Sequence, residues 1–228
     1  MIAHKKKFYG GAGLMAMFII VLIIFFSPVF NGQNGLEYLD DLYNSISKGS
    51  AHYIADLKKE ALTFSGTSVN LDLAMKDSKQ AQLAVTLFTK SGASANVSGS
   101  ALKVAGDLAK ILGNCLTDAD HMYGNEGRKV ADKYGYEEKR VLYNWWTAMK
   151  EMDKNLKKQK MFKEAKIVTT VKKKAVESSY NYYKIVPQKI SDKYGTVIFS
   201  LIFYVVYTVW YGFAIMFMFE GWGMKLEH

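Results

Sequence analysis

The densest group of metal-ligating side chains is the segment Asp118-Ala119-Asp120-His121, with Glu126 five residues further on. Carboxylate and imidazole groups are ligands for divalent ions, so Asp118, Asp120 and His121 are the candidate metal ligands of this chain. The segment has neither HExxH spacing nor a second histidine, and acids beside a glycine turn are ordinary at the end of a surface helix. We therefore predict no metal ion and no other cofactor.

The single cysteine, Cys115, is the only candidate thiol nucleophile. One cysteine excludes an intramolecular disulfide and a cysteine-built zinc or iron–sulfur site. Cys115 lies on an apolar stripe of helical spacing, which favours a buried and inert thiol. A nucleophile would need a neighbouring base, and His52 and His121 are the only histidines in residues 31–195. Because no catalytic constellation is convincing, we predict that the chain is not an enzyme.

A row of hydroxyl groups lies in the second of two long apolar runs. At 100° per residue its members fall within roughly 60° of arc on one helix face; they are Ser200, Tyr204, Tyr207 and Tyr211. Polar groups inside a bilayer usually face protein, since unsatisfied hydroxyls are costly in lipid. We therefore predict an intramembrane assembly surface, and packing against the first apolar run is the alternative.

A second candidate surface is basic. Residues 128–195 carry a net charge of +10, whereas residues 31–127 carry −3. This density favours contact with anionic lipid headgroups or an acidic partner, and a solvated helix face is the simpler alternative. Nucleic acid is not expected outside the cytoplasm. The lysines concerned are Lys154, Lys157, Lys158, Lys160, Lys163, Lys166, Lys172, Lys173 and Lys174.

The elements that must position these residues begin with the two apolar runs, 12–30 and 196–219, each long enough to cross a bilayer as a helix. Ser27–Asn31 offers no small-x-small cleavage pair, which favours an uncleaved signal anchor over a cleaved signal peptide. Lys5–Lys7 precede the first run and acids follow it, which places the N-terminus in the cytoplasm. We predict an integral protein of a bacterial inner (plasma) membrane, with residues 1–11 and 220–228 cytoplasmic and 31–195 extracytoplasmic.

Residues 31–195 are numerous enough to form a core of their own. Apolar residues at helical spacing predict helices over about 36–64, 71–90, 99–122 and 136–186. Both spans enter the same membrane face, so an up-and-down bundle of four helices would return the chain to its start. The predicted fold is thus all-α, with two transmembrane helices flanking an extracytoplasmic bundle.

Two features of this region leave alternatives open. Residues 69–75 also alternate between apolar and polar types, as in a strand. The last helix, with coiled-coil-like seam spacing, is longer than a compact bundle needs, so it is either broken or projects as a stalk. Trp145 and Trp146 are adjacent on it, and we expect one ring in the core and the other half-buried.

These features favour a non-enzymatic membrane subunit that acts as an accessory, scaffold or assembly protein. Its expected partners are membrane lipids and either further copies of itself or other subunits of a membrane complex. The alternatives are a ligand-binding sensor or transport accessory with a pocket in the bundle, and an oligomeric pore lined by the second run. The last three residues, Leu226–His228, resemble the start of a vector-encoded histidine tag or are native, and they are excluded from this reasoning.

Overall fold

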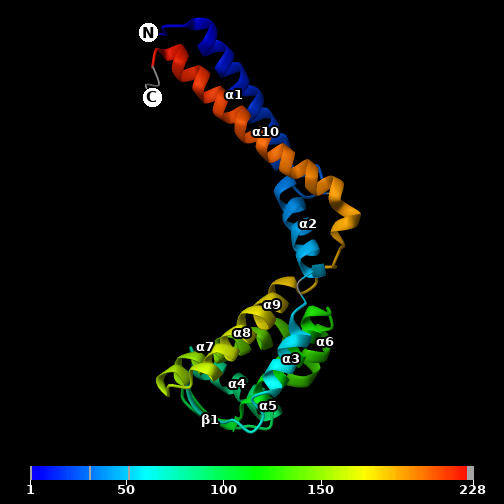
Figure 1. Ribbon diagram of the computed structural model, residues 1–228, viewed down its shortest axis with the longest axis vertical. Coiled ribbons are helices and arrows are strands. Elements are labelled where there is room, and N and C mark those ends of the chain that lie inside the picture. The colour runs from blue at the N-terminus through cyan, green and yellow to red at the C-terminus, as the bar shows by residue number, and fades with distance from the viewer. Residues whose placement is uncertain (1, 31, 51, 225–228) are drawn as a thin grey trace. The chain divides into compact units, whose positions relative to one another are not determined.

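A computed structural model describes the chain except for Met1, Asn31, Ala51 and residues 225–228, so the tag-like Leu226–His228 lie outside the described residues. The chain divides into two compact units. The hairpin unit comprises Met1–Ser50 and Val186–His228, and the inserted unit comprises Ala51–Ile185. The protein is mostly helical, as the sequence predicts (Figure 1).

The hairpin unit is built on two long helices, α1 (Lys5–Phe26) and α10 (Ile190–Trp222). Among the described residues these are the two helices that are long and apolar enough to cross a membrane, which agrees with the two predicted spans. They pack side by side and antiparallel (Figure 1). Lys7 Nζ lies 2.8 Å from Glu220 Oε2 at one end, and the rings of Phe25 and Phe203 stack at the other.

Helix α2 (Gly35–Ser50) completes the hairpin unit. It begins with a reciprocal capping pair: the Glu37 amide donates to Asn34 Oδ1 at 2.9 Å, and the Asn34 amide donates to Glu37 Oε2 at 3.0 Å. Its amphipathic face contacts the chain around the start of α10, where the Gln188 amide donates to the Ser45 carbonyl. The short amphipathic helix α2 therefore lies against the beginning of the long apolar helix α10.

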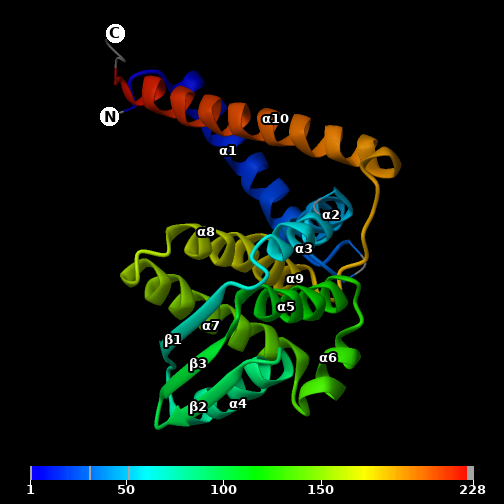
Figure 2. The ribbon, with the colours of Figure 1, turned by 60° about the horizontal axis from the view of Figure 1, so that its bottom comes forward.

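The inserted unit combines helices with a small antiparallel sheet in the order β1-β3-β2 (Figure 2). Its strands are β1 (Ser68–Ala74), β2 (Ser94–Ser98) and β3 (Ala101–Asp107). Its helices are α3 (Ile54–Leu62), α4 (Ser78–Lys90), α5 (Leu108–Tyr123), α6 (Gly127–Tyr134), α7 (Glu138–Lys158), α8 (Phe162–Val171), the π-helix η1 (Lys172–Glu177) and α9 (Ser178–Tyr182). Trp145, Phe88 and Leu112 are fully buried in the core that the helices and sheet share.

The all-α prediction is wrong for two of the four helices, which begin as strands. The predicted helix 36–64 is also divided, into α2 and α3, which belong to different units. Residues 71–90 begin as β1, whose alternating burial matches its apolar alternation, and helix α4 starts only after the cap Asp77. Residues 99–122 begin as β3, and α5 starts after Asp107. The two-residue turn Gly99-Ser100, with Gly99 at φ +60°, joins β2 to β3 and is a hairpin signal. Both segments are strands because β1 pairs with β3, which lies about thirty residues further along the chain.

The predicted long final helix is broken, which is one of the two alternatives left open. Helix α7 ends at Lys158, and Lys160 adopts a left-handed φ of +63°. Segments α8, η1 and α9 then pack back against α7. Trp145 is fully buried and Trp146 half-buried, as predicted.

Candidate partner-binding surfaces

The four residues of the hydroxyl row on α10 have different surroundings. Ser200 is buried and lies 2.6 Å, oxygen to oxygen, from the hydroxyl of Tyr43 on α2. The Ser200 hydroxyl also donates to the Val197 carbonyl at 2.8 Å, so the consistent arrangement has Tyr43 donating to Ser200. Tyr43 was missed by the sequence analysis because α2 was assigned to the bundle.

The three tyrosines of the row do not share one neighbour. The ring of Tyr207 stacks on Phe18 of α1 with centroids 4.7 Å apart, and the ring of Tyr211 lies 5.3 Å from Phe18. Tyr204 is 66% exposed. Within the described part of the chain, none of these three hydroxyls makes a hydrogen bond, whereas the indole of Trp210 donates to the Leu14 carbonyl.

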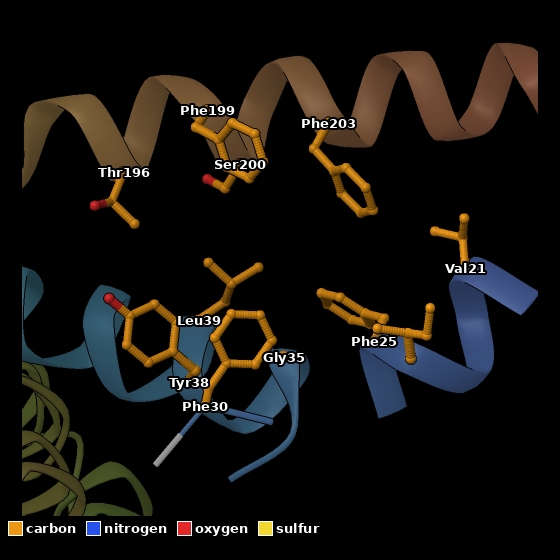
Figure 3. A pocket seen from close by; sticks show the side chains of 11 residues that line it. Val21, Phe25, Phe30, Gly35, Tyr38, Leu39, Thr196, Phe199, Ser200 and Phe203 are labelled. Atoms are coloured by element: carbon orange, nitrogen blue, oxygen red, sulfur yellow. The ribbon is translucent and has the colours of Figure 1, made fainter. Parts of the chain in front are cut away.

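A cavity of about 370 Å³ lies where α1, α2 and the first turns of α10 meet. Figure 3 shows Phe199 and Phe203 of α10 facing Leu39 of α2 and Phe25 of α1 across it. Among the described residues, its lining contains no carboxylate, amine, thiol or imidazole, and its polar groups are the hydroxyls of Tyr38, Thr196 and Ser200. This mostly apolar space suits hydrocarbon such as a lipid acyl chain.

The three candidate metal ligands point to different partners. Asp118 is completely buried, and Asp120 lies 2.6 Å from Lys58 Nζ and 3.0 Å from His52 Nε2. Although burial alone would raise the pKa of Asp120, the hydrogen bonds from Lys58 and His52 lower it. His121 Nδ1 is instead 2.8 Å from Glu126 Oε2. Among the described residues, no three His, Cys, Asp or Glu side chains are gathered to hold a metal ion.

Asp118 is the acceptor at the centre of a buried polar network. Its carboxylate accepts hydrogen bonds from Lys133 Nζ at 2.6 Å, from the Tyr134 hydroxyl at 2.6 Å and from Trp145 Nε1 at 2.9 Å. Burial and the Asp118 charge raise the pKa of Tyr134. Burial likewise raises the pKa of the Cys115 thiol, which is the inert state that the sequence predicts. The network ties α5, α6 and α7 together, and its three donors occupy three of the roughly four acceptor positions of the carboxylate.

The nine lysines of the predicted basic surface extend over the end of α7, α8 and η1. Eight of them are exposed, and Lys172 is half-buried. Local acids engage two of them, with Lys154 2.6 Å from Glu151 and Lys157 2.8 Å from Asp153. Contact with lipid or an acidic partner stays a prediction.

Comparison with protein-family models, with curated proteins and with solved structures found no match to this chain.

Proposed function

We propose that the chain is a non-enzymatic integral membrane subunit that assembles with other protein through α10. In this proposal α1 and α10 span a bacterial inner membrane with both termini in the cytoplasm, and the chain between them is extracytoplasmic. The partner is a further copy or another subunit of a membrane complex, and the protein serves as a scaffold or assembly factor.

The observation that carries the proposal is the unpaired tyrosine hydroxyls of an apolar helix. Tyr204 is largely exposed, and its hydroxyl has no hydrogen-bond partner among the described residues. In hydrocarbon such a group gains by pairing with a neighbouring helix, by about 0.5–2 kcal/mol for each bond. Helix α1 does not meet this need, because its side chains over Met15–Phe26 are apolar or thioether groups.

The structure makes the roles of individual tyrosines distinguishable. The ring of Tyr207 is engaged by Phe18 within the chain, so its loss should weaken the helix pair. Tyr204 has no such contact, so its loss should weaken assembly alone. We therefore expect Tyr204→Leu to lower the assembled fraction without changing the stability of the monomer.

Native mass spectrometry of the protein in mild detergent tests the proposal. The wild type is compared with a Tyr204/Tyr207/Tyr211→Phe variant, which removes only hydroxyls, and with the corresponding Leu variant, which also removes rings. Phe213→Leu is the matched control, since it removes an exposed ring from the same helix. A monomeric wild type that is recovered without other polypeptides would refute assembly, and an assembly that survives both triple changes would refute the tyrosine surface.

A further inference from the structure

An aromatic groove lies in the inserted unit between α7 and the returning segment η1–α9. It has a volume of about 290 Å³. Helix α7 supplies Leu142, Tyr143 and Trp146, and the returning segment supplies Val176, Glu177, Tyr180 and Asn181. The lining is thus predominantly apolar and aromatic, with the rings of Tyr143 and Trp146 stacked 6.3 Å apart. A π-helix forms part of one wall, a feature that is frequent at functional sites.

Each aromatic ring of the groove carries at least one cation over its face. Lys139 Nζ lies 5.4 Å from the Tyr180 ring centre, and the Arg140 guanidinium lies 5.3 Å from the Tyr143 ring centre. Lys150 and Lys172 each place Nζ 5.5 Å from the Trp146 ring centre. Of these four cations only Lys172 belongs to the basic surface that the sequence predicts.

Among the described residues, the one carboxylate that lines the groove is already engaged. Glu177 Oε1 accepts a hydrogen bond from the Trp146 indole at 2.7 Å. The nearby Glu138 accepts from the Tyr183 hydroxyl, and Glu137 caps the start of α7. A negative ligand charge inside the groove would therefore be repelled by Glu177, whereas a negative charge at the rim would be attracted by the four cations. The groove thus suits a ligand with an apolar group inside it and acidic groups at its rim.

We propose that this groove binds an acidic peptide segment of a partner protein, with one apolar or aromatic anchor side chain in the groove and its carboxylates on the rim cations. Large anchors in pockets that exclude water dominate the energetics of protein interfaces. The volume falls at the lower limit of the roughly 300–1,000 Å³ typical of small-molecule sites, which suits a single side chain.

The spacing of the rim cations favours a peptide over a lipid headgroup. Lys139 and Lys150 are eleven residues apart on α7, which corresponds to about 16 Å along the helix. A chain of several carboxylates can follow such a row, whereas one headgroup meets only part of it. This inference is independent of assembly through α10, because its test measures peptide binding whatever the oligomeric state.

The test uses the full chain in nonionic detergent and a fluorescein-labelled peptide, Asp-Glu-Asp-Phe-Glu-Asp-Glu, followed by fluorescence polarisation. Two comparison peptides replace Phe with Gly or all acids with Lys. We expect binding of the first peptide, at least tenfold weaker binding of the Gly peptide and no binding of the Lys peptide.

Variants then locate the site. Trp146→Ala and the pair Lys150→Gln with Lys172→Gln should each weaken binding by about tenfold or more. The matched control is Lys158→Gln with Lys163→Gln, which removes the same charge from exposed positions away from the groove and should change affinity less than about twofold. Trp146→Phe keeps a ring and should retain most binding, and thermal melting verifies that every variant is folded.

Several results would overturn the proposal. Equal losses in the two lysine pairs would indicate a diffuse basic surface, and equal binding of the Phe and Gly peptides would remove the anchor. If the peptide does not bind but vesicles containing phosphatidylglycerol do, with the same dependence on Trp146, the groove is a lipid site and the peptide proposal is wrong.

Discussion

Asp118 illustrates how much a single side chain can connect in this protein. It is an acid with no exposed surface, and it joins three helices through Lys133, Tyr134 and Trp145. The side chain of Lys133 is 27% exposed, so one partner of the ion pair still reaches water while the other does not. Removing a buried partner from such a pair leaves the remaining charge and donors unsatisfied, which costs far more than the pair itself contributes.

We expect Asp118→Ala to lower the free energy of unfolding by about 3–5 kcal/mol, and Asp118→Asn to cost less because it retains one acceptor oxygen. Thermal unfolding of the full chain in detergent, followed by circular dichroism, measures both changes. Asp120→Asn is the control, because its partly exposed pairs with Lys58 and His52 should contribute about 1 kcal/mol or less. Equal effects of Asp118→Ala and Asp120→Asn would show that the buried network is not what holds these helices.

At the scale of elements, the antiparallel packing of α1 on α10 depends on glycine at one position of α1. A Cβ atom built on Gly11 would lie 2.7 Å from the Met218 amide nitrogen and 2.8 Å from the Ala214 carbonyl oxygen. Both are backbone atoms, which cannot rotate away as a side chain can. Small residues allow this close approach in membrane helix pairs.

We therefore expect Gly11→Ala to separate the helices and weaken the pair by about 1–3 kcal/mol. Gly10→Ala and Gly13→Ala are matched controls, since a Cβ at either position meets no atom within 4 Å. Energy transfer between dyes on Ala3→Cys and Met224→Cys, followed during titration with sodium dodecyl sulfate, measures the separation. Gly11→Ala should shift the midpoint to lower detergent and the controls should not, and a common shift of all three would contradict close packing at Gly11.

The elements also show what could be predicted from sequence and what could not. Length and apolarity were enough for the two membrane-length helices, and adjacency was enough to place Trp145 inside and Trp146 half outside. The alternation at 69–75 left a strand open there, but β1 is defined by pairing with β3, from Ser68 opposite Asp107 to Ala74 opposite Ala101, and no local window contains both. Strands β2 and β3 were not predicted. A helical period and a strand period overlap in such short apolar runs.

The same reason explains which parts of the candidate sites were found. The hydroxyl row and the lysines are local patterns within one segment. Tyr43 beside Ser200, and Glu177 beside Trp146, come from segments 157 and 31 residues apart. The second pair exists only because the chain reverses at Lys160, a lysine at positive φ that carries no glycine or proline signal.

At the scale of the whole molecule, the chain passes between the two units twice, near residues 50–51 and 185–186. Within each unit, hydrogen bonds fix the segments next to these two passages. In the inserted unit, His52 pairs with Asp120, and the Asn125 side chain binds the backbone of Lys184 and Ile185. Both passages are thus fixed at the α5–α6 corner. In the hairpin unit, the Gln188 amide donates to the Ser45 carbonyl. If α1 and α10 span a membrane as proposed, this arrangement suits them, because both helices would then leave the same membrane face.

The last prediction is the orientation itself: both termini in the cytoplasm and the inserted unit outside. The three lysines at the start of α1 and the acids after its end motivate it. Asn96→Cys, on the exposed strand β2, should react with a membrane-impermeant maleimide in intact cells or, for an inner membrane, in spheroplasts. Met224→Cys, exposed just after α10, should react only once the membrane is opened.

The native Cys115 can remain in both variants, because it is completely buried and burial raises the pKa of its thiol, so that little reactive thiolate forms. The wild type serves as the unlabelled control. If Met224→Cys is labelled in the sealed preparation and Asn96→Cys is not, the orientation is the opposite of the one predicted. Labelling of both positions from the same side would mean that α10 does not cross the membrane, because a single crossing must separate a residue before the helix from one after it.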